Sequence, residues 1–247
     1  MHPPLVDYHC HLDLYPDHES LFEQCRGSEI EILTVTTTPR AWKKNKELAG
    51  ECSNIRRGLG LHPQLVAEGL NESPLFESLL SETRFVGEVG LDASPRFYKG
   101  FEAQKRSFER VLCCCAEYGG KILSIHSVRT ARESLAMIEK FLPSDKGKAI
   151  LHWFTVSKSE VKRAVELGCF FSVNGEMLKR DSIRASVASM PLDRILTETD
   201  GPFTNTNGRP SVPSDVSSTL TGLAFLLQSD FASLRSQIAT NLRNLEA

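Results

Sequence analysis

The chain has 247 residues and a formal net charge of −2, with 40% hydrophobic and 24% charged residues, an ordinary composition for a globular protein. This charge excludes the overall attraction to nucleic acid that a strongly basic surface provides, although bound metal ions add local positive charge that the count omits. No apolar run approaches the ~20 residues that cross a bilayer, and the N-terminus lacks the basic and apolar regions of a signal peptide. We therefore expect a cytoplasmic protein without membrane contact.

The cysteine pattern agrees with a reducing compartment. Three of the seven cysteines, Cys113, Cys114 and Cys115, are adjacent, and no C-x-x-C pair occurs. Neighbouring cysteines cannot all form unstrained disulfides, so we interpret them as small buried hydrophobic residues rather than as disulfides or zinc ligands.

Eight strand-like segments recur along the chain, with helical stretches between them. In chain order they cover residues 5–9, 29–36, 57–62, 85–92, 121–126, 149–153, 170–174 and 194–200. Two of the helical stretches have a clear apolar face, made of Phe108, Val111, Leu112 and Cys115 in one and of Val161, Ala164 and Val165 in the other. A loop rich in proline and glycine over 201–214 precedes the last helix, which we place over either 219–227 or 230–245.

Eight strands and seven crossovers in ~250 residues predict an α/β fold of the (β/α)8 TIM-barrel type. No linker or internal repeat divides the sequence, so we expect one domain over 1–247. An open doubly wound sheet is the alternative, but Gly58 and Gly60 lack the third glycine of a nucleotide-binding fingerprint.

His9 and His11 form a candidate metal-binding pair at the end of the first strand. Side chains alternate along a strand, so these two imidazoles point the same way, about 7 Å apart along one surface. Taken alone, the pair could equally be two ordinary surface histidines.

Further potential ligands lie at or near the C-terminal ends of other predicted strands, which form the catalytic face of such a barrel. Each residue alone has an ordinary structural explanation, such as a helix cap for Asp200. Their convergence on one rim favours a common site. The set is His9, His11, Glu88, His126, His152 and Asp200.

Such a set can support metal-assisted hydrolysis. Imidazole and carboxylate ligands suit zinc or manganese, whereas magnesium prefers more oxygen. Glu88 could bridge two ions about 3.5–4 Å apart, and Asp200 could bind one ion and orient or deprotonate its water. Glu198 shares the inward face of the eighth strand and is a candidate partner for a ligand histidine.

Seven sequence blocks, from about Val6 to Pro202, resemble the TatD family of metal-dependent deoxyribonucleases in order and spacing. They are D-Y-H-C-H-L-D, G-L-H-P, V-G-E-V-G-L-D, I-H-S, L-H-W-F, F-F-S-V-N-G and L-T-E-T-D-G-P. The segment 101–118 also resembles the family's glutamine-containing helix. The resemblance implies a TIM-like barrel, two divalent ions and hydrolysis of DNA phosphodiester bonds, commonly from a single-stranded or 3′ end. It carries the metal-ligand role to His9, His11, Glu88, His126, His152 and Asp200.

The chain departs from the family pattern where substrate is expected. Val128 stands where the family often has an arginine, with Arg129 one place later, and the usual C-F-S-G is replaced by W-F-T-V at 153–156. Losing that glycine removes a point where backbone could approach a phosphate closely. Arg96 and Arg129 are possible substrate contacts, although the loop that carries Arg96 could equally be solvated. We interpret His62 as a phosphate contact or a partner of a ligand rather than as a ligand itself.

The short chain, the W-F pair and the S-V-N-G block are similar to the TatD-like members of bacterial Qat anti-phage defence operons. This narrower resemblance implies a cytoplasmic protein that works beside partner subunits.

Two other functions remain open on the sequence. One is an amidohydrolase that cuts C–N bonds in a small molecule or modified base. Many such enzymes bridge their metals with a carboxylated lysine on strand four, where this chain has Glu88 and no lysine. The other is a metal-stabilised, non-catalytic subunit of a larger complex.

Overall fold

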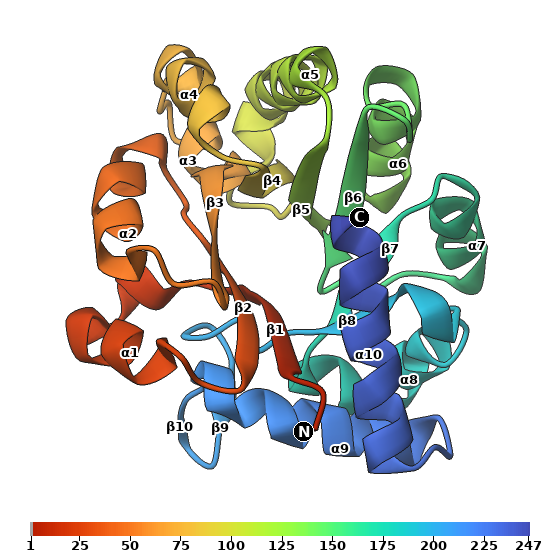
Figure 1. The fold of residues 1–247 in the computed structure, drawn as a ribbon. Helices are drawn as coiled ribbons and strands as arrows, with labels where there is room; N and C mark the ends of the chain where they lie inside the picture. Colours follow the sequence, from red (N-terminus) through yellow and green to blue (C-terminus); the bar gives the residue numbers. More distant parts are fainter. Residues whose placement is uncertain (1) are drawn as a thin grey trace.

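Eight parallel strands in chain order form the sheet of this protein, for which a computed structural model describes residues 2–247 (Figure 1). The strands form a nearly closed barrel, which confirms the predicted (β/α)8 fold. They are β1 Leu5–Cys10, β2 Ile30–Val35, β3 Ile55–Leu61, β4 Phe85–Asp92, β5 Lys121–Val128, β6 Gly147–His152, β7 Phe170–Val173 and β8 Ile195–Thr197.

Helices surround the barrel because each parallel strand needs a crossover to reach the next (Figure 1). The predicted apolar face of the segment before β5 is buried, while in the segment before β7 Val161 and Ala164 are buried and Val165 is half-buried. The helices are α1 His18–Cys25, α2 Trp42–Ala49, α3 Pro63–Ala67, α4 Ser73–Leu79, α5 Phe101–Tyr118, α6 Ala131–Phe141, α7 Lys158–Glu166, α8 Asp181–Val187, α9 Val216–Leu226 and α10 Phe231–Glu246.

The last strand is shorter than its sequence pattern indicates. The predicted strand 194–200 ends at Thr197, so its extension to Asp200 is wrong. Asp200 has a φ of 53°, a left-handed backbone conformation that cannot continue a strand. The chain then returns toward β1, where the Asp200 N–H donates a hydrogen bond of 2.9 Å to the His9 carbonyl.

The region after β8 contains more regular structure than predicted. A small hairpin, β9 Asn205–Thr206 and β10 Arg209–Pro210, lies within the expected loop. Asn207 and Gly208 at its tip both have positive φ, which is typical of the tight turn that an Asn-Gly pair favours. Both segments proposed for the last helix are helical, as α9 and α10. None of the helices within residues 2–247 is long and apolar enough to span a bilayer.

Candidate metal centre

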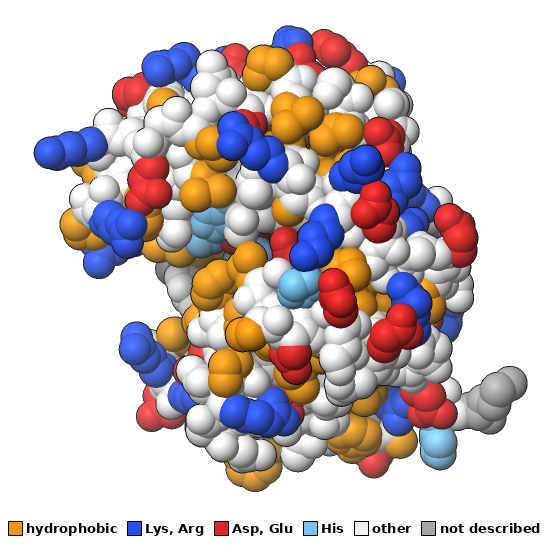
Figure 2. Space-filling model, turned by 90° about the vertical axis from the view of Figure 1, so that its left-hand side faces the viewer, with side chains coloured by type: hydrophobic (Ala, Val, Ile, Leu, Met, Phe, Trp, Pro, Cys, Tyr) orange, Lys and Arg blue, Asp and Glu red, His pale blue; other side chains and the backbone are white. Residues whose placement is uncertain are grey.

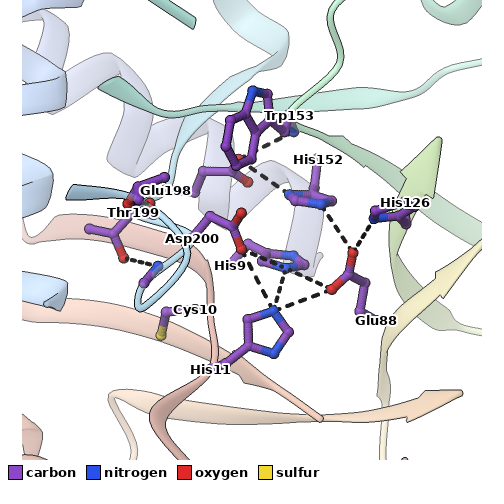
Figure 3. Close-up of polar contacts among 12 residues, drawn as sticks. His9, Cys10, His11, Glu88, His126, His152, Trp153, Glu198, Thr199 and Asp200 are labelled. Atoms are coloured by element: carbon purple, nitrogen blue, oxygen red, sulfur yellow. Dashed lines mark hydrogen bonds and ion pairs between the residues drawn. The ribbon is translucent and has the colours of Figure 1, made fainter. Parts of the chain in front are cut away.

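The six proposed ligands lie together at the C-terminal end of the barrel, although they come from five separate strand regions (Figure 3). All six are buried, the most exposed being His126 at 9%. Burial of so many ionisable groups is costly unless they are paired or bind a metal. They are His9 on β1, His11 just after it, Glu88 on β4, His126 on β5, His152 at the end of β6 and Asp200 after β8.

Glu88 lies where β4 departs from regular pairing. The register of β4 shifts near this residue against both β3 and β5, and such irregularities redirect side chains beside functional sites. The neighbouring backbone is close enough to require glycine, since a Cβ on Gly60 would lie 1.6 Å from the Thr36 carbonyl oxygen. A Cβ on Gly90, whose φ is 141°, would lie 2.1 Å from the His126 carbonyl oxygen. Glycine at positions 60 and 90 therefore allows the close packing of β4 on its neighbours that positions Glu88.

One oxygen of the Glu88 carboxylate faces three imidazoles. Its Oε1 lies 2.6 Å from His126 Nδ1, 3.1 Å from His152 Nε2 and 3.3 Å from His62 Nε2. His62 is thus as close to Glu88 as the proposed ligands, and nearer to the centre than the sequence indicated.

The other oxygen of Glu88 faces the strand-one pair. Its Oε2 lies 3.2 Å from His11 Nε2 and 3.5 Å from His9 Nε2, and the two Nε2 atoms are 3.3 Å apart. The two imidazoles therefore point toward the same place, as the alternation along β1 predicts. Each carboxylate oxygen has its own group of histidines.

Two sets of potential ligands share Glu88 as a result. His9, His11 and Glu88 form one, and His62, Glu88 and His126 form the other, with the donor atoms in each set within 4.8 Å of one another. A third set joins His9 and His152 to Glu198. This arrangement suits two adjacent cations with a carboxylate between them.

Asp200 supplies an unsatisfied acceptor beside the first set. Its Oδ1 is buried without a hydrogen-bond partner, as is Nδ1 of His11, and it lies 3.6 Å from Nε2 of both His9 and His11. Burial raises the pKa of the Asp200 carboxyl to about 7, although His152 and His11 oppose the shift. An orphaned carboxylate oxygen next to imidazole nitrogens fits a divalent cation, because both are ligand types of zinc and manganese.

The electrostatics of the centre are those of a carboxylate enclosed by imidazoles. Burial opposes ionisation of Glu88, but His62, His152 and His126 hold its pKa well below the usual range. Burial, with His152 nearby, lowers the pKa of His9 to about 4. For His152 the effect of burial is outweighed by Glu198 and Glu88, which raise its pKa. His9 is therefore neutral, as a metal ligand must be.

Glu198 orients one of these imidazoles from deeper in the barrel. Its Oε1 lies 3.3 Å from His152 Nδ1 and accepts hydrogen bonds from the Asn174 amide at 2.9 Å and from the Trp153 N–H at 3.2 Å. On the other side of the centre, Ser124 Oγ lies 2.7 Å from His9 Nδ1. Such partners fix ring orientation and tautomer.

Asp92 is a residue of the site that the sequence reasoning did not single out. Its Oδ2 lies 3.3 Å from His126 Nε2 and accepts a hydrogen bond of 2.7 Å from the Gln64 amide. Gln104 on α5 accepts from the Asp92 N–H at 2.7 Å. Asp92 is the last residue of β4, so the strand-end rule that selected the other residues could have identified it.

The two arginines proposed as substrate contacts lie in different surroundings. A cavity of about 530 Å³ opens over the centre, and Arg129 is among its lining residues, along with Glu88, His126, His152 and Asp200. Arg96 is not among them; it is exposed and forms an ion pair of 2.8 Å with Glu68. On the face that Figure 2 shows, basic and acidic side chains are mixed, without an extended basic track.

Comparison with known proteins gives consistent matches over nearly the whole chain. A family model described as "TatD related DNase" matches residues 6–246. The chain is 28% identical over 218 residues to "Uncharacterized metal-dependent hydrolase YcfH" of Escherichia coli K12, covering 81% of this chain and 78% of that protein. It is 28% identical over 198 residues to "3'-5' ssDNA/RNA exonuclease TatD" of Klebsiella pneumoniae, covering 76% and 73%.

Among solved structures, the TatD homologue YJJV of Escherichia coli superposes with a TM-score of 0.87 and 24% identity, and the match covers 99% of this chain and 98% of that one. A likeness at this identity shows the fold.

Proposed function

The chain belongs to the TatD-related DNase family, and we propose that it is a metal-dependent hydrolase that cleaves phosphodiester bonds in DNA. The observation that carries this proposal is the position of Glu88 between two groups of imidazoles, one facing each carboxylate oxygen. A carboxylate placed between two groups of ligands suits a two-metal hydrolytic centre.

We assign the metal-ligand role to His9, His11, Glu88, His126, His152 and Asp200, with His62 close enough to take part. The donor set favours zinc or manganese, with magnesium as the alternative. When bound, two such ions lower the pKa of a coordinated water and stabilise the negative charge that develops on the phosphoryl oxygens.

Three side chains around the centre have separate roles in the proposed reaction. Asp200 Oδ1 has no hydrogen-bond partner and the residue lines the cavity, so it can orient the attacking water and accept its proton. Glu198 keeps His152 in place, and Arg129 supplies positive charge on the cavity wall.

The substrate part of the proposal is single-stranded DNA or a 3′ end. One relative is named as a 3'-5' ssDNA/RNA exonuclease, which supports this part of the proposal. The W-F and S-V-N-G blocks support a further proposal, that the protein is cytoplasmic and works with the other subunits of an anti-phage defence operon.

The test uses purified protein, end-labelled single-stranded DNA, and added manganese, magnesium or zinc. We expect metal-dependent cleavage that chelation stops and that Glu88→Gln reduces by at least about 10²-fold, since it removes the shared charge. Glu166→Gln on the exposed surface of α7 is the matched control and retains activity. Absence of cleavage with every metal, or full activity in Glu88→Gln, would contradict the proposal.

A further inference from the structure

The wall of the cavity beside the metal centre carries an exposed aromatic surface, and we propose that Trp153 binds a nucleobase by stacking, next to the phosphodiester to be cleaved. The inference rests on the proposed phosphodiester hydrolysis and adds a residue that binds its substrate. That substrate is a nucleotide whose base is unpaired and free to stack.

Trp153 directly follows the proposed ligand His152 and lines the cavity (Figure 3). It is half-buried, packing against the core while remaining open to the cavity. The next residue, Phe154, is fully buried, with its ring 6.0 Å from that of Phe171. The two aromatic residues of this block thus have different surroundings: core packing encloses Phe154 completely and Trp153 only in part.

The backbone of Trp153 is held in an unfavourable conformation. Its φ is 44°, in the left-handed region that bulky residues rarely adopt. The Trp153 N–H donates a hydrogen bond of 3.2 Å to Glu198 Oε1, the oxygen that also lies 3.3 Å from His152 Nδ1. Strained residues concentrate at ligand-binding sites, where surrounding structure maintains them. The contacts that orient His152 therefore also hold the backbone of Trp153, from which the indole side chain extends.

Two further hydrophobic side chains complete the cavity mouth. Val128 and Phe203 are 41% and 57% exposed, respectively, although both line the cavity. Phe203 contacts His11 edge to face, with 5.1 Å between ring centroids. His11 and His152 approach different oxygens of Glu88. Phe203 therefore adjoins the His11 side of the centre, and Trp153 lines the same cavity next to His152 in the chain.

The charge of the cavity wall supports a base rather than a long phosphate backbone as the bound group. Arg129 is the one arginine, and no lysine is present, among the residues that line this cavity. Proteins that track a nucleic-acid backbone use many basic contacts, whereas aromatic side chains bind unpaired bases of any sequence through their π faces. A base in a duplex is already stacked on both faces, so this surface selects single-stranded substrate.

A binding experiment tests the inference without hydrolysis. The chain contains two tryptophans, and Trp42 is 2% exposed on α2. In a Trp42→Phe background the fluorescence therefore comes from Trp153 alone. In the presence of Mg²⁺ we expect thymidine 5′- or 3′-monophosphate to quench this fluorescence and deoxyribose 5-phosphate, which lacks the base, to leave it unchanged. Equal responses to the nucleotide and the sugar phosphate, or no response to either, would overturn the inference.

A kinetic experiment compares oligothymidylate with an abasic single strand of the same length. Trp153→Ala and Trp153→Asn should each raise KM for oligothymidylate about tenfold, with kcat changed less than about twofold and with little effect on the abasic strand. Asn tolerates left-handed backbone, so a loss common to both variants reports the ring rather than the strain. Trp153→Phe keeps an aromatic face and should restore most of the affinity.

The kinetic outcomes separate this inference from the proposed function. If the wild-type protein cleaves both strands with the same KM, or if the variants impair both strands alike, Trp153 has a structural role and the inference fails. If the wild-type protein cleaves neither strand, the proposed function fails, and the fluorescence titration then decides on base binding by itself.

Discussion

The Asp7 carboxylate accepts two hydrogen bonds from Thr199, one from its N–H at 2.8 Å and one from its hydroxyl at 2.6 Å. Asp7 is on β1 and Thr199 follows β8, so this pair joins the first and last strands of the barrel directly beneath Asp200. The contact between β1 and the segment after β8 thus depends on side-chain hydrogen bonds as well as on backbone hydrogen bonds.

Replacing Thr199 by valine should therefore weaken the contact between β1 and the segment after β8, and with it both stability and activity. The change preserves volume but leaves a buried Asp7 oxygen without its donor, which we expect to reduce the free energy of unfolding by about 1–3 kcal/mol. It should also lower kcat, because Asp200 is the next residue. Denaturant titration and steady-state kinetics measure the two effects. Thr221→Val, at an exposed position of α9, is the control, and an equal effect in both variants would argue against the role of this pair.

Glu198→Gln should weaken metal binding without removing a ligand. Glutamine retains the shape of Glu198 but loses the charge beside His152 Nδ1, and its amide cannot satisfy every donor that now points at the carboxylate. Partners of ligand histidines contribute about 10–100-fold to metal affinity. Competition with a chromophoric zinc chelator measures this loss. Unchanged zinc affinity would show that Glu198 does not support the centre.

Metal removal should destabilise the whole barrel, because the centre joins β1, β4, β5, β6 and the segment after β8. An ion at 100 times its Kd stabilises the native state by about 2.7 kcal/mol, which corresponds to roughly 5–10 °C in Tm for a chain of this size. Calorimetry of chelated and metal-loaded protein measures the shift. In Glu88→Gln, metal should raise Tm much less. A full rise in Tm in that variant would contradict the shared position of Glu88.

Buried thiols should make the fold sensitive to alkaline pH. Burial raises the pKa of Cys115 to about 12 and that of Cys169 to about 12, from a usual value of 9. Between pH 9 and 12 the unfolded chain loses these protons while the folded chain keeps them, so stability falls as pH rises. Each thiol contributes a slope of up to about 1.4 kcal/mol per pH unit in this range.

Unfolding free energies at pH 8 and pH 10 test this expectation. Cys115→Ala should be less stable than wild type at pH 8, because it leaves a cavity, but should lose less stability on going to pH 10. Parallel pH profiles for the wild type and the variant would show that the thiol is accessible to hydroxide in the native state.

Much of the barrel could be predicted because its strands repeat a local pattern. The segment 85–92 was predicted with the bounds that β4 has in the structure, since a short, mostly apolar segment is typical of a buried parallel strand. The end of β8 could not be predicted in this way. The left-handed backbone of Asp200 is maintained by contacts with β1, and such contacts join residues about 190 positions apart.

The same distinction between local sequence pattern and long-range contacts applies to the site. The residue types and their places at strand ends predicted a common site, because all strand ends of a parallel barrel meet at one face, and the structure places these residues together: His9, His11, Glu88, His126, His152 and Asp200. Asp92 and the closeness of His62 to Glu88 were not found, because side-chain distances depend on how neighbouring strands are staggered. The sequence shows that Trp153 departs from the family pattern, but it does not show where the side chain lies.

The sequence by itself determined the order of strands and helices and the chemistry available at one rim, since both follow from local periodicity and residue type. Only the tertiary structure decided that Glu88 presents one oxygen to each group of histidines, that Asp200 keeps an unpaired oxygen, and that Trp153 lines the cavity while Phe154 is buried. These relationships depend on strand register and backbone dihedral angles, which are set by packing across the whole barrel rather than by neighbouring residues in the chain.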